Sequence, residues 1–264
     1  YVVNYDDATF YRYSQSQKPL VRALLGGKID AVMRNSKLVI AGNRHLADYA
    51  VNKAGAPRVE ILPTVVDLSR YPKGARKDND IFTIGWIGSP STAKYLLAIA
   101  PALARVCEAG KGRVVLVGAG SVKLPGVPVE ARAWSEDTEV KDLESCDAGI
   151  MPLYDGLWEK GKCGIKTIQY MACSLPVVVS PVGVNKEIVE DGVNGFLASG
   201  HEEWVRALTA LRDDKALRLR LGNAGRKKVE ERYSVQVTAP KFTALIIEAA
   251  RLKERLDTAA GWKV

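Results

Sequence analysis

Short apolar runs alternate along the chain with longer segments in which apolar residues recur at helical spacing. The runs predict strands at Val2–Val3, 37–41, 58–62, 81–87, 113–117, 127–131, 147–151 and 176–180. The segments between them predict helices near 18–35, 43–54, 93–108, 139–145 and 165–173. Strands that alternate with helices are typical of βαβ units, which form a parallel sheet with right-handed crossovers. We therefore predict an α/β fold.

A polar segment with Pro and Gly, residues 72–80, has the composition of a linker between two parts of the chain. We predict a partial α/β unit over residues 1–75 and a complete nucleotide-binding-type domain over 80–233. We expect the last helix, residues 235–260, to pack back towards the N-terminal unit.

That last helix carries one apolar stripe, formed by Phe242, Leu245, Ile246, Ala249, Leu252 and Leu256. Such a stripe is typical of a helix that packs on the body of its protein. The alternative is a helix that lies on a membrane surface, because Lys241, Arg251, Lys253 and Arg255 flank the stripe.

The composition excludes several classes of protein. The chain has 264 residues, of which 47% are hydrophobic and 26% charged, as in ordinary globular proteins and unlike disordered or collagen-like chains. No apolar run reaches the length of about 18 residues that a membrane-spanning helix needs. Because the chain begins at Tyr1 without a basic and then apolar leader, we expect a mature form or, in preference, a piece of a longer protein.

The four cysteines and two histidines lack the spacing of metal ligands, so we predict no metal site. Cysteines in such strand-like and helix-like contexts are typical of a reducing compartment, and we expect a cytoplasmic protein. The net charge of +8 favours anionic ligands such as nucleotide phosphates or acidic lipids. No run of Lys and Arg concentrates this charge, so we expect no nucleic acid partner.

Two glycine-containing turns follow predicted strands. In the first, Gly88-Ser89-Pro-Ser91-Thr92, the glycine lets a ligand approach the backbone, and Ser91 or Thr92 could cap a helix whose N-terminus attracts phosphate. Plain helix capping explains the same residues. The second turn, Gly118-Ala-Gly120, has Lys123 where a dinucleotide fingerprint has its third glycine, which argues against NAD.

A third segment, Trp158 to Cys173, combines glycines and lysines before a predicted helix. Gly161 and Gly164 free the backbone, and Lys162 and Lys166 bring ammonium groups towards the helix N-terminus. A helix N-terminus with lysines favours an anion, at the edge of a parallel sheet where ligands bind. The alternative is that both lysines are solvated on an exposed loop.

The run from residue 161 to 198, GKCGIKTIQYMACSLPVVVSPVGVNKEIVEDGVNGFLA, resembles the donor half of family 4 glycosyltransferases with GT-B architecture. Residues 84–92, the Val-Gly-x-Gly turn and residues 226–234 extend the resemblance. Residues 39–49 and 61–67 are similar to the family's last acceptor-domain strands and the crossover into its donor domain. The resemblance implies a Rossmann-like donor domain and a partial acceptor unit that lacks its start.

The family's Glu-x7-Glu motif falls on Gly161 and Gln169, so both carboxylates are replaced. Gln169 can still exchange hydrogen bonds with ribose hydroxyls, the role that the resemblance implies for this position. Asp155 or Glu159 could substitute for the first carboxylate. The family's acceptor-side catalytic position aligns near Asp6, beside Asp7, although both could be ordinary loop carboxylates.

The resemblance and the turns together give three groups of expected site residues. The catalytic candidates are Asp6, Asp7 and Glu159. The expected binders of the donor diphosphate are Gly88, Ser89, Ser91, Thr92, Lys162, Gly164, Ile165 and Lys166. The expected binders of the nucleotide are Gly118, Gly120, Trp134, Pro152, Leu153 and Gln169.

The resemblance implies a retaining glycosyltransferase that moves a sugar from a nucleotide-diphosphate sugar to an acceptor hydroxyl without a metal or other cofactor. The acceptor could be a glycan, a lipid-linked glycan or a small molecule, and peripheral contact with the inner face of the membrane is open. The replaced carboxylates also permit a binding module that holds nucleotide without catalysis.

Overall fold

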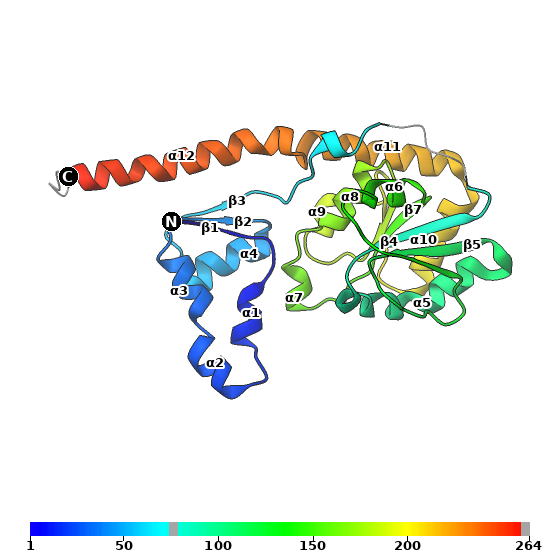
Figure 1. Cartoon of the computed structure of the whole chain (residues 1–264), viewed down its shortest axis with the longest axis horizontal. Helices are drawn as coiled ribbons and strands as arrows, with labels where there is room; N and C mark the ends of the chain where they lie inside the picture. The colour runs from blue at the N-terminus through cyan, green and yellow to red at the C-terminus, as the bar shows by residue number, and fades with distance from the viewer. Residues whose placement is uncertain (74–78, 260–264) are drawn as a thin grey trace. The chain divides into compact units, whose positions relative to one another are not determined.

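The computed structural model describes residues 1–73 and 79–259, with side chains through Arg251 (Figure 1). The chain divides into two compact units. Unit 1 contains residues 1–65, 156–163 and 235–264, and unit 2 contains residues 66–155 and 164–234. Each unit has its own parallel sheet with helices, which is an α/β fold.

Unit 1 has a three-stranded parallel sheet in the order β1-β2-β3. Its strands are β1 (Val2–Tyr5), β2 (Leu38–Ala41) and β3 (Val59–Ile61). Its helices are α1 (Thr9–Ser14), α2 (Pro19–Leu25), α3 (Lys28–Arg34), α4 (Arg44–Tyr49) with the π-helical turn η1 (Ala50–Ala54), α7 (Leu157–Lys160) and α12 (Val235–Ala259).

The central strand β2 is buried on both faces, because alternate residues of a strand point to opposite sides of the sheet. Val39 and Ala41 pack in one apolar cluster with side chains from α1, α3 and α4. Leu38 and Ile40 pack in another, with Ala249 of α12. The four consecutive apolar residues of β2 therefore serve two separate cores.

Only part of the predicted stripe on the last helix packs against this sheet. Leu245 and Ile246 contact the same cluster as Ala249. Phe242 remains 43% exposed. Leu252 and Leu256 lie among residues whose side chains the structure does not describe.

Unit 2 has a six-stranded parallel sheet in the order β6-β5-β4-β7-β8-β9. Its strands are β4 (Phe82–Ile87), β5 (Gly112–Val117), β6 (Val129–Arg132), β7 (Ala148–Met151), β8 (Val177–Val179) and β9 (Phe196–Leu197). Numbered within the unit, this is the order 3-2-1-4-5-6 of a doubly wound nucleotide-binding fold. The direction of winding reverses between β4 and β7, and ligands of such folds bind at the carboxyl ends of the strands beside this reversal.

Helices cover both faces of this sheet (Figure 1). They are α5 (Lys94–Cys107), α6 (Glu139–Glu144), α8 (Ile165–Ala172), α9 (Asn185–Ile188), α10 (His201–Asp213) and α11 (Lys215–Arg232), with the short 3-10 helices η2 (Leu68–Arg70), η3 (Pro90–Thr92) and η4 (Glu108–Gly110). Leu103 and Trp204 are buried with Ile84 on one face. Ile168 and Leu143 are buried with Val115 on the other.

The two units divide the chain at other points than the sequence predicts. The first division falls between residues 65 and 66, before the polar segment at 72–80, because Val66 bridges to Ser234 and Tyr71 is buried in the unit 2 core. Residues 156–163, predicted within the second domain, belong to unit 1, and Cys163 is part of a unit 1 core.

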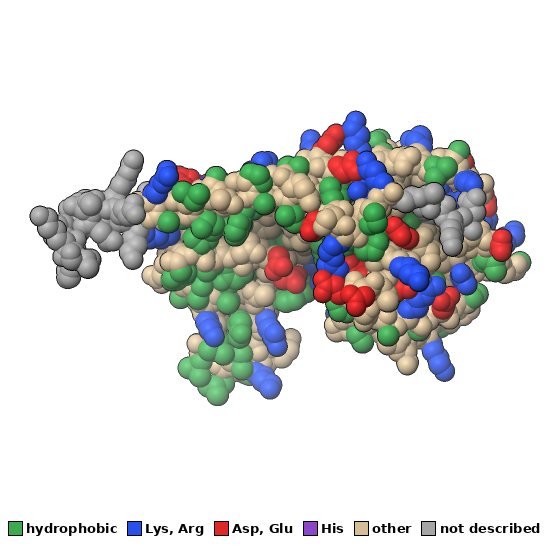
Figure 2. All heavy atoms as spheres, turned by 45° about the horizontal axis from the view of Figure 1, so that its top comes forward, with side chains coloured by type: hydrophobic (Ala, Val, Ile, Leu, Met, Phe, Trp, Pro, Cys, Tyr) green, Lys and Arg blue, Asp and Glu red, His purple; other side chains and the backbone are tan. Residues whose placement is uncertain are grey.

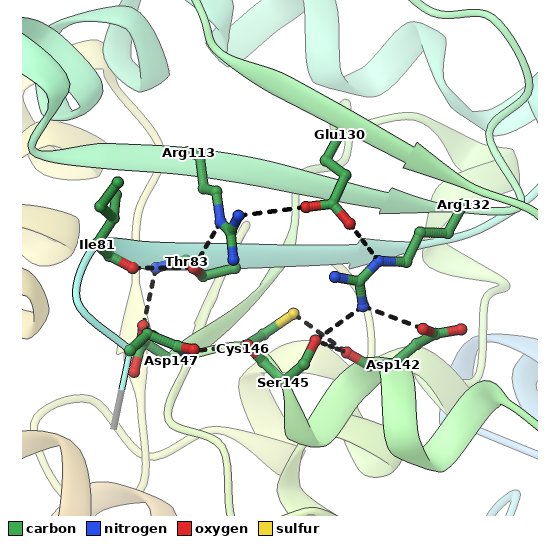
Figure 3. A network of polar contacts seen from close by, with 10 residues as sticks. Ile81, Thr83, Arg113, Glu130, Arg132, Asp142, Ser145, Cys146 and Asp147 are labelled. Atoms are coloured by element: carbon green, nitrogen blue, oxygen red, sulfur yellow. Dashed lines mark hydrogen bonds and ion pairs between the residues drawn. The ribbon is translucent and has the colours of Figure 1, made fainter. Parts of the chain in front are cut away.

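A network of charged side chains fixes α6 to the edge of the unit 2 sheet (Figure 3). Arg132 of β6 donates to Glu130 at 2.7 Å and to Asp142 of α6 at 3.0 Å. Arg113 of β5 reaches Glu130 at 3.4 Å, and the hydrogen bond from Arg132 lowers the pKa of Glu130. Because α6 begins at Glu139, the network also sets the position of that carboxylate.

Candidate functional site

The candidate donor site is built on the loops that follow β4 and β7 in unit 2. Gly88 follows β4, and Pro152 and Leu153 follow β7, so all three lie beside the reversal of the sheet. Pro152 is buried, and the backbone N–H of Leu153 donates to Ser180 Oγ at 3.0 Å. The β7 loop is thereby held against the end of β8.

Lys166, in the first turn of α8, reaches the loop that follows β4. Its ammonium lies 4.5 Å from the centroid of the Trp86 ring and donates to Thr92 Oγ1 at 3.3 Å. A side chain on Gly88 would collide with both this ammonium and the Trp86 ring, which explains the glycine. The structure therefore brings Gly88, Thr92 and Lys166 together, as the sequence predicts of diphosphate binders.

The prediction that Ser91 or Thr92 caps the following helix is wrong. Helix α5 begins at Lys94, and its N-cap Ala93 makes no side-chain cap. The intervening 3-10 turn instead directs Thr92 Oγ1 to the Ser89 carbonyl at 2.9 Å, and Ser89 Oγ lies 2.9 Å from Ser91 Oγ. The exposed hydroxyls of Ser89 and Ser91 keep hydrogen-bonding capacity for a ligand.

The second glycine turn lies next to the first. Gly118 and Gly120 have φ values of 79° and 67°, a region that favours glycine. A Cβ on Gly118 would lie 2.8 Å from the Gly88 carbonyl oxygen and 3.1 Å from Trp134 Cβ. The ends of β4, β5 and β6 therefore bring Gly88, Gly118 and the 53%-exposed Trp134 side by side.

Gln169, on α8, lies against a buried carboxylate that the sequence does not identify. Its amide Nε2 donates to Glu139 Oε1 at 2.8 Å. Tyr71 OH donates to the same oxygen, and Trp134 Nε1 donates to Glu139 Oε2, each at 2.8 Å. Burial, followed by the hydrogen bond to Glu139, raises the pKa of Tyr71. No local motif marks Glu139, because its partners lie up to 68 residues away.

The start of α8 needs a glycine for conformational reasons. Gly164 is its N-cap with a φ of 71°, and a Cβ there would collide with Ile188. Ile165 follows as the first helical residue and is 38% exposed. Lys166 therefore projects from a turn whose geometry is fixed.

Lys162 belongs to unit 1, although the sequence groups it with Lys166. Its ammonium lies 4.0 Å from Asp7 Oδ1. Asp7 is half-buried, and burial raises its pKa while Lys162 opposes that shift. Asp6, the preceding residue, is exposed. The structure thus places both candidate catalytic aspartates and Lys162 at the carboxyl end of β1.

Two contacts hold residues 156–163 against this edge of unit 1. The amide of Asn43 donates to the Lys162 carbonyl at 3.1 Å, while Asn43 Oδ1 accepts from the Leu46 N–H and caps α4. Gly161 approaches Ala8 so closely that a Cβ would collide with it. Unit 1 therefore has no room for the glutamate that the family motif has at position 161.

Glu159 and His45 are two further polar residues of unit 1. Glu159 is 8% exposed and lies in α7. His45 Nε2 is 3.3 Å from Tyr11 OH, and burial together with Lys160 lowers the histidine pKa. From the sequence alone, the two histidines are weighed only as possible metal ligands. The place of His45 just after a predicted strand is one where ligands of α/β folds bind.

Unit 1 also contains an open cavity of about 330 Å³. Asn4, Asp6 and Thr64 line it with polar groups at the ends of β1 and β3. Val235 and Phe242 of α12 are among its apolar lining residues. The cavity could hold a molecule with both a hydroxyl group and an apolar part.

Neither a metal centre nor a membrane span stands out in what the structure describes. Among residues 1–73 and 79–251, no three Cys, His, Asp or Glu side chains gather as metal ligands would. No helix in the described part of the chain has the length and apolar character needed to cross a membrane.

Comparison with known proteins identifies the family. The family model for Glycosyl transferases group 1 matches residues 78–214, just over half of the chain. The chain belongs to this family. It is 24% identical over 256 residues to a D-inositol 3-phosphate glycosyltransferase from Xylanimonas cellulosilytica, and the match covers 84% of the chain and 59% of that relative.

Solved structures of other glycosyltransferases share the fold. A sucrose-phosphate synthase from Thermosynechococcus elongatus superposes with a TM-score of 0.75 at 16% identity, covering 95% of this chain and 68% of that one. HepE from Anabaena, in complex with UDP-glucose, gives a TM-score of 0.71 at 17% identity and covers 94% and 72%. The GT-B architecture is therefore shown. The group 1 glycosyltransferase chain spans no more than about three fifths of the length of the first curated relatives it matches.

Proposed function

We propose that this group 1 glycosyltransferase transfers a sugar from a nucleotide-diphosphate sugar to an acceptor hydroxyl, with retention of the anomeric configuration. The observation that carries the proposal is the ammonium of Lys166 at the Gly88 loop. This cation lies beside the reversal point of a doubly wound sheet, where such folds bind nucleotides. HepE, which has the same fold, was crystallised with UDP-glucose, so UDP is the first nucleotide to test.

The chemistry follows from the charge of the leaving group. Cleavage of the bond between the sugar and the diphosphate leaves negative charge on the phosphate oxygens. Lys166, the hydroxyls of Ser89 and Ser91 and the N-terminus of α8 would stabilise that charge from fixed positions. In this proposal these groups take the place of a metal ion.

The acceptor side of the proposal rests on unit 1. Asp6 lines the cavity there, and Asp7 and Glu159 supply further carboxylates. One of these carboxylates would accept a hydrogen bond from the acceptor hydroxyl as it attacks. The mixed lining of the cavity suits an acceptor that joins a polar group to an apolar part.

The test is calorimetry of the full chain with UDP, GDP and ADP. Lys166→Met should weaken binding of the preferred nucleotide by at least about tenfold, because a hydrogen bond to a charged group contributes about 1.5–3 kcal/mol. The control is Lys111→Met. Lys111 is exposed and directly precedes β5, so it lies at the amino ends of the strands and not at the carboxyl ends that carry the site. Equal affinities of both variants would refute the diphosphate site.

A second candidate function is nucleotide binding without transfer. Gly161 and Gln169 favour it, because they replace the two carboxylates of the family motif. An assay for released or transferred sugar, run with the nucleotide sugar that binds best, separates the two functions. Binding without product would support the binding module, and NMR of any product would reveal the anomeric configuration.

Contact with a membrane surface is the remaining part of the proposal. Apolar side chains are exposed along α12 (Figure 2). They include Ile247, and also Val235 and Phe242, which line the unit 1 cavity. Lys241 and Arg251 lie on the same helix. The protein should sediment with anionic vesicles, and Ile247→Ser should reduce the sedimented fraction if α12 makes the contact, because Ile247 is exposed and does not line the cavity.

A further inference from the structure

The carboxyl group of Glu139 is buried among three side-chain donors. Only 5% of the residue is exposed. Tyr71 OH, Gln169 Nε2 and Trp134 Nε1 each donate to it at 2.8 Å. An ionised carboxylate accepts hydrogen bonds and donates none. The group that Gln169 turns towards Glu139 must therefore be its NH₂, and its carbonyl oxygen Oε1 must point elsewhere.

We propose that Glu139 is a positioning residue, which orients Gln169 so that the amide oxygen accepts a hydrogen bond from a ribose hydroxyl of the donor nucleotide. This inference rests on the proposed function and adds a role for a residue outside the family motif. Gln169 is partly exposed. Trp134, which donates to the other oxygen of Glu139, lies against Gly118 beside the Gly88 loop. The network is thus continuous with the candidate diphosphate site.

The same geometry explains why position 169 has no carboxylate. A glutamate there would place its carboxylate about 2.8 Å from that of Glu139, where both cannot be ionised. The negative charge is held at position 139, and position 169 keeps an uncharged acceptor. Restoring the family glutamate at 169 should therefore harm the site unless the charge at 139 is removed at the same time.

The experiment is a charge exchange between the two positions. Calorimetry measures the affinity for UDP, and for GDP and ADP if UDP does not bind, in the wild type, Gln169→Glu, Glu139→Gln and the double variant. Gln169→Glu should weaken binding by at least about tenfold at pH 8 and by less at pH 6, where one carboxyl of the pair takes up a proton. The double variant should bind within about threefold of the wild type, because it again pairs one carboxylate with one amide.

Three further measurements separate a positioning role of Glu139 from general damage to the fold. The wild type should bind the nucleoside diphosphate more tightly than its 2′,3′-dideoxy form, and Gln169→Ala should lose this preference. Glu136→Gln removes a 70%-exposed carboxylate from the same segment and should leave binding unchanged. In the absence of nucleotide, the melting temperature of Gln169→Glu relative to wild type should fall from pH 5 to pH 8.

The outcomes distinguish this inference from the proposed function. If the wild type binds none of the three nucleotides, both fail. If the wild type binds one of them but Gln169→Glu binds equally well at pH 8, or the double variant is no better than the single ones, Glu139 has no positioning role. A wild type that binds the dideoxy form equally well would also overturn the inference.

Discussion

Gly161 shows how a single missing side chain can be a requirement of packing. The backbone and Cβ of Ala8 occupy the space that a Cβ on residue 161 would need. We predict that Gly161→Ala lowers the free energy of unfolding by about 1–3 kcal/mol, the usual cost of overpacking a buried site. Urea denaturation measures the change, with Gly27→Ala of the same unit as control, since nothing lies within 4 Å of a Cβ there. Equal losses in the two variants would contradict the steric explanation.

Asp7 offers a prediction about pH. Burial raises its pKa in the folded protein above the unfolded value, so the folded state holds the proton more tightly. The contribution of Asp7 to the free energy of unfolding is therefore fully present below the unfolded pKa, near 4. It is lost as the pH rises through the folded pKa. Asp7→Asn, which cannot ionise, should be more stable than wild type at pH 7, and the gain should shrink towards pH 4.

Thermal unfolding between pH 4 and pH 8 measures this difference. Asp6→Asn removes a charge from the adjacent exposed position and controls for the change in net charge. A gain for Asp7→Asn that stays constant with pH would exclude the ionisation of Asp7 as its source.

The sequence allows the grouping of some candidate site residues to be predicted but not that of others, for a physical reason. Gly88 and Thr92 lie between β4 and α5, and Lys166 lies at the start of α8, positions that the local pattern reveals. Glu139 is 30 residues from Gln169 along the chain. Their pairing depends on how α6 is fixed to the sheet, and no local pattern contains that information.

At the level of elements, long apolar runs were predicted more reliably than short ones. The strands of the unit 2 sheet from β4 to β8 all overlap predicted segments, although β5 begins one residue earlier than predicted and β6 ends one residue later. The central strands give the clear signal, because a central strand of a parallel sheet is apolar on both faces. β9 has two residues and gives no such signal. Residues 156–163 pack with unit 1 through Asn43 and Ala8, contacts over more than 110 residues that sequence spacing does not show.

Helix α12 gives a prediction at the same level. Ala249 is 4% exposed and packs with Leu38 and Ile40 of β2, whereas the next residue, Ala250, is exposed. Ala249→Lys should lower the free energy of unfolding by at least about 2 kcal/mol, because an ammonium cannot be buried there without a partner. Ala250→Lys should change it by no more than about 0.5 kcal/mol. Similar values for both variants in urea denaturation would show that α12 does not stabilise unit 1.

At the scale of the whole molecule, the two units are interleaved along the chain. Unit 1 consists of three separate segments, and the two segments of unit 2 connect them. When unit 2 unfolds, the segments of unit 1 are joined only by long flexible loops, whose closure costs conformational entropy. Unit 1 should therefore depend on the folding of unit 2 even where its own contacts are unchanged.

This dependence predicts the effect of nucleotide on the whole chain. A ligand at 100 times its dissociation constant stabilises the folded state by about 2.7 kcal/mol. If UDP binds to unit 2 as proposed, it should slow hydrogen exchange in the slowest amides of β4 and β5, and also in β1 and β2 of unit 1. Exchange measured by mass spectrometry with and without UDP tests this, and Lys166→Met under the same conditions should show little of either effect. Slower exchange confined to unit 2 would mean that unit 1 unfolds independently, despite the three segments from which it is assembled.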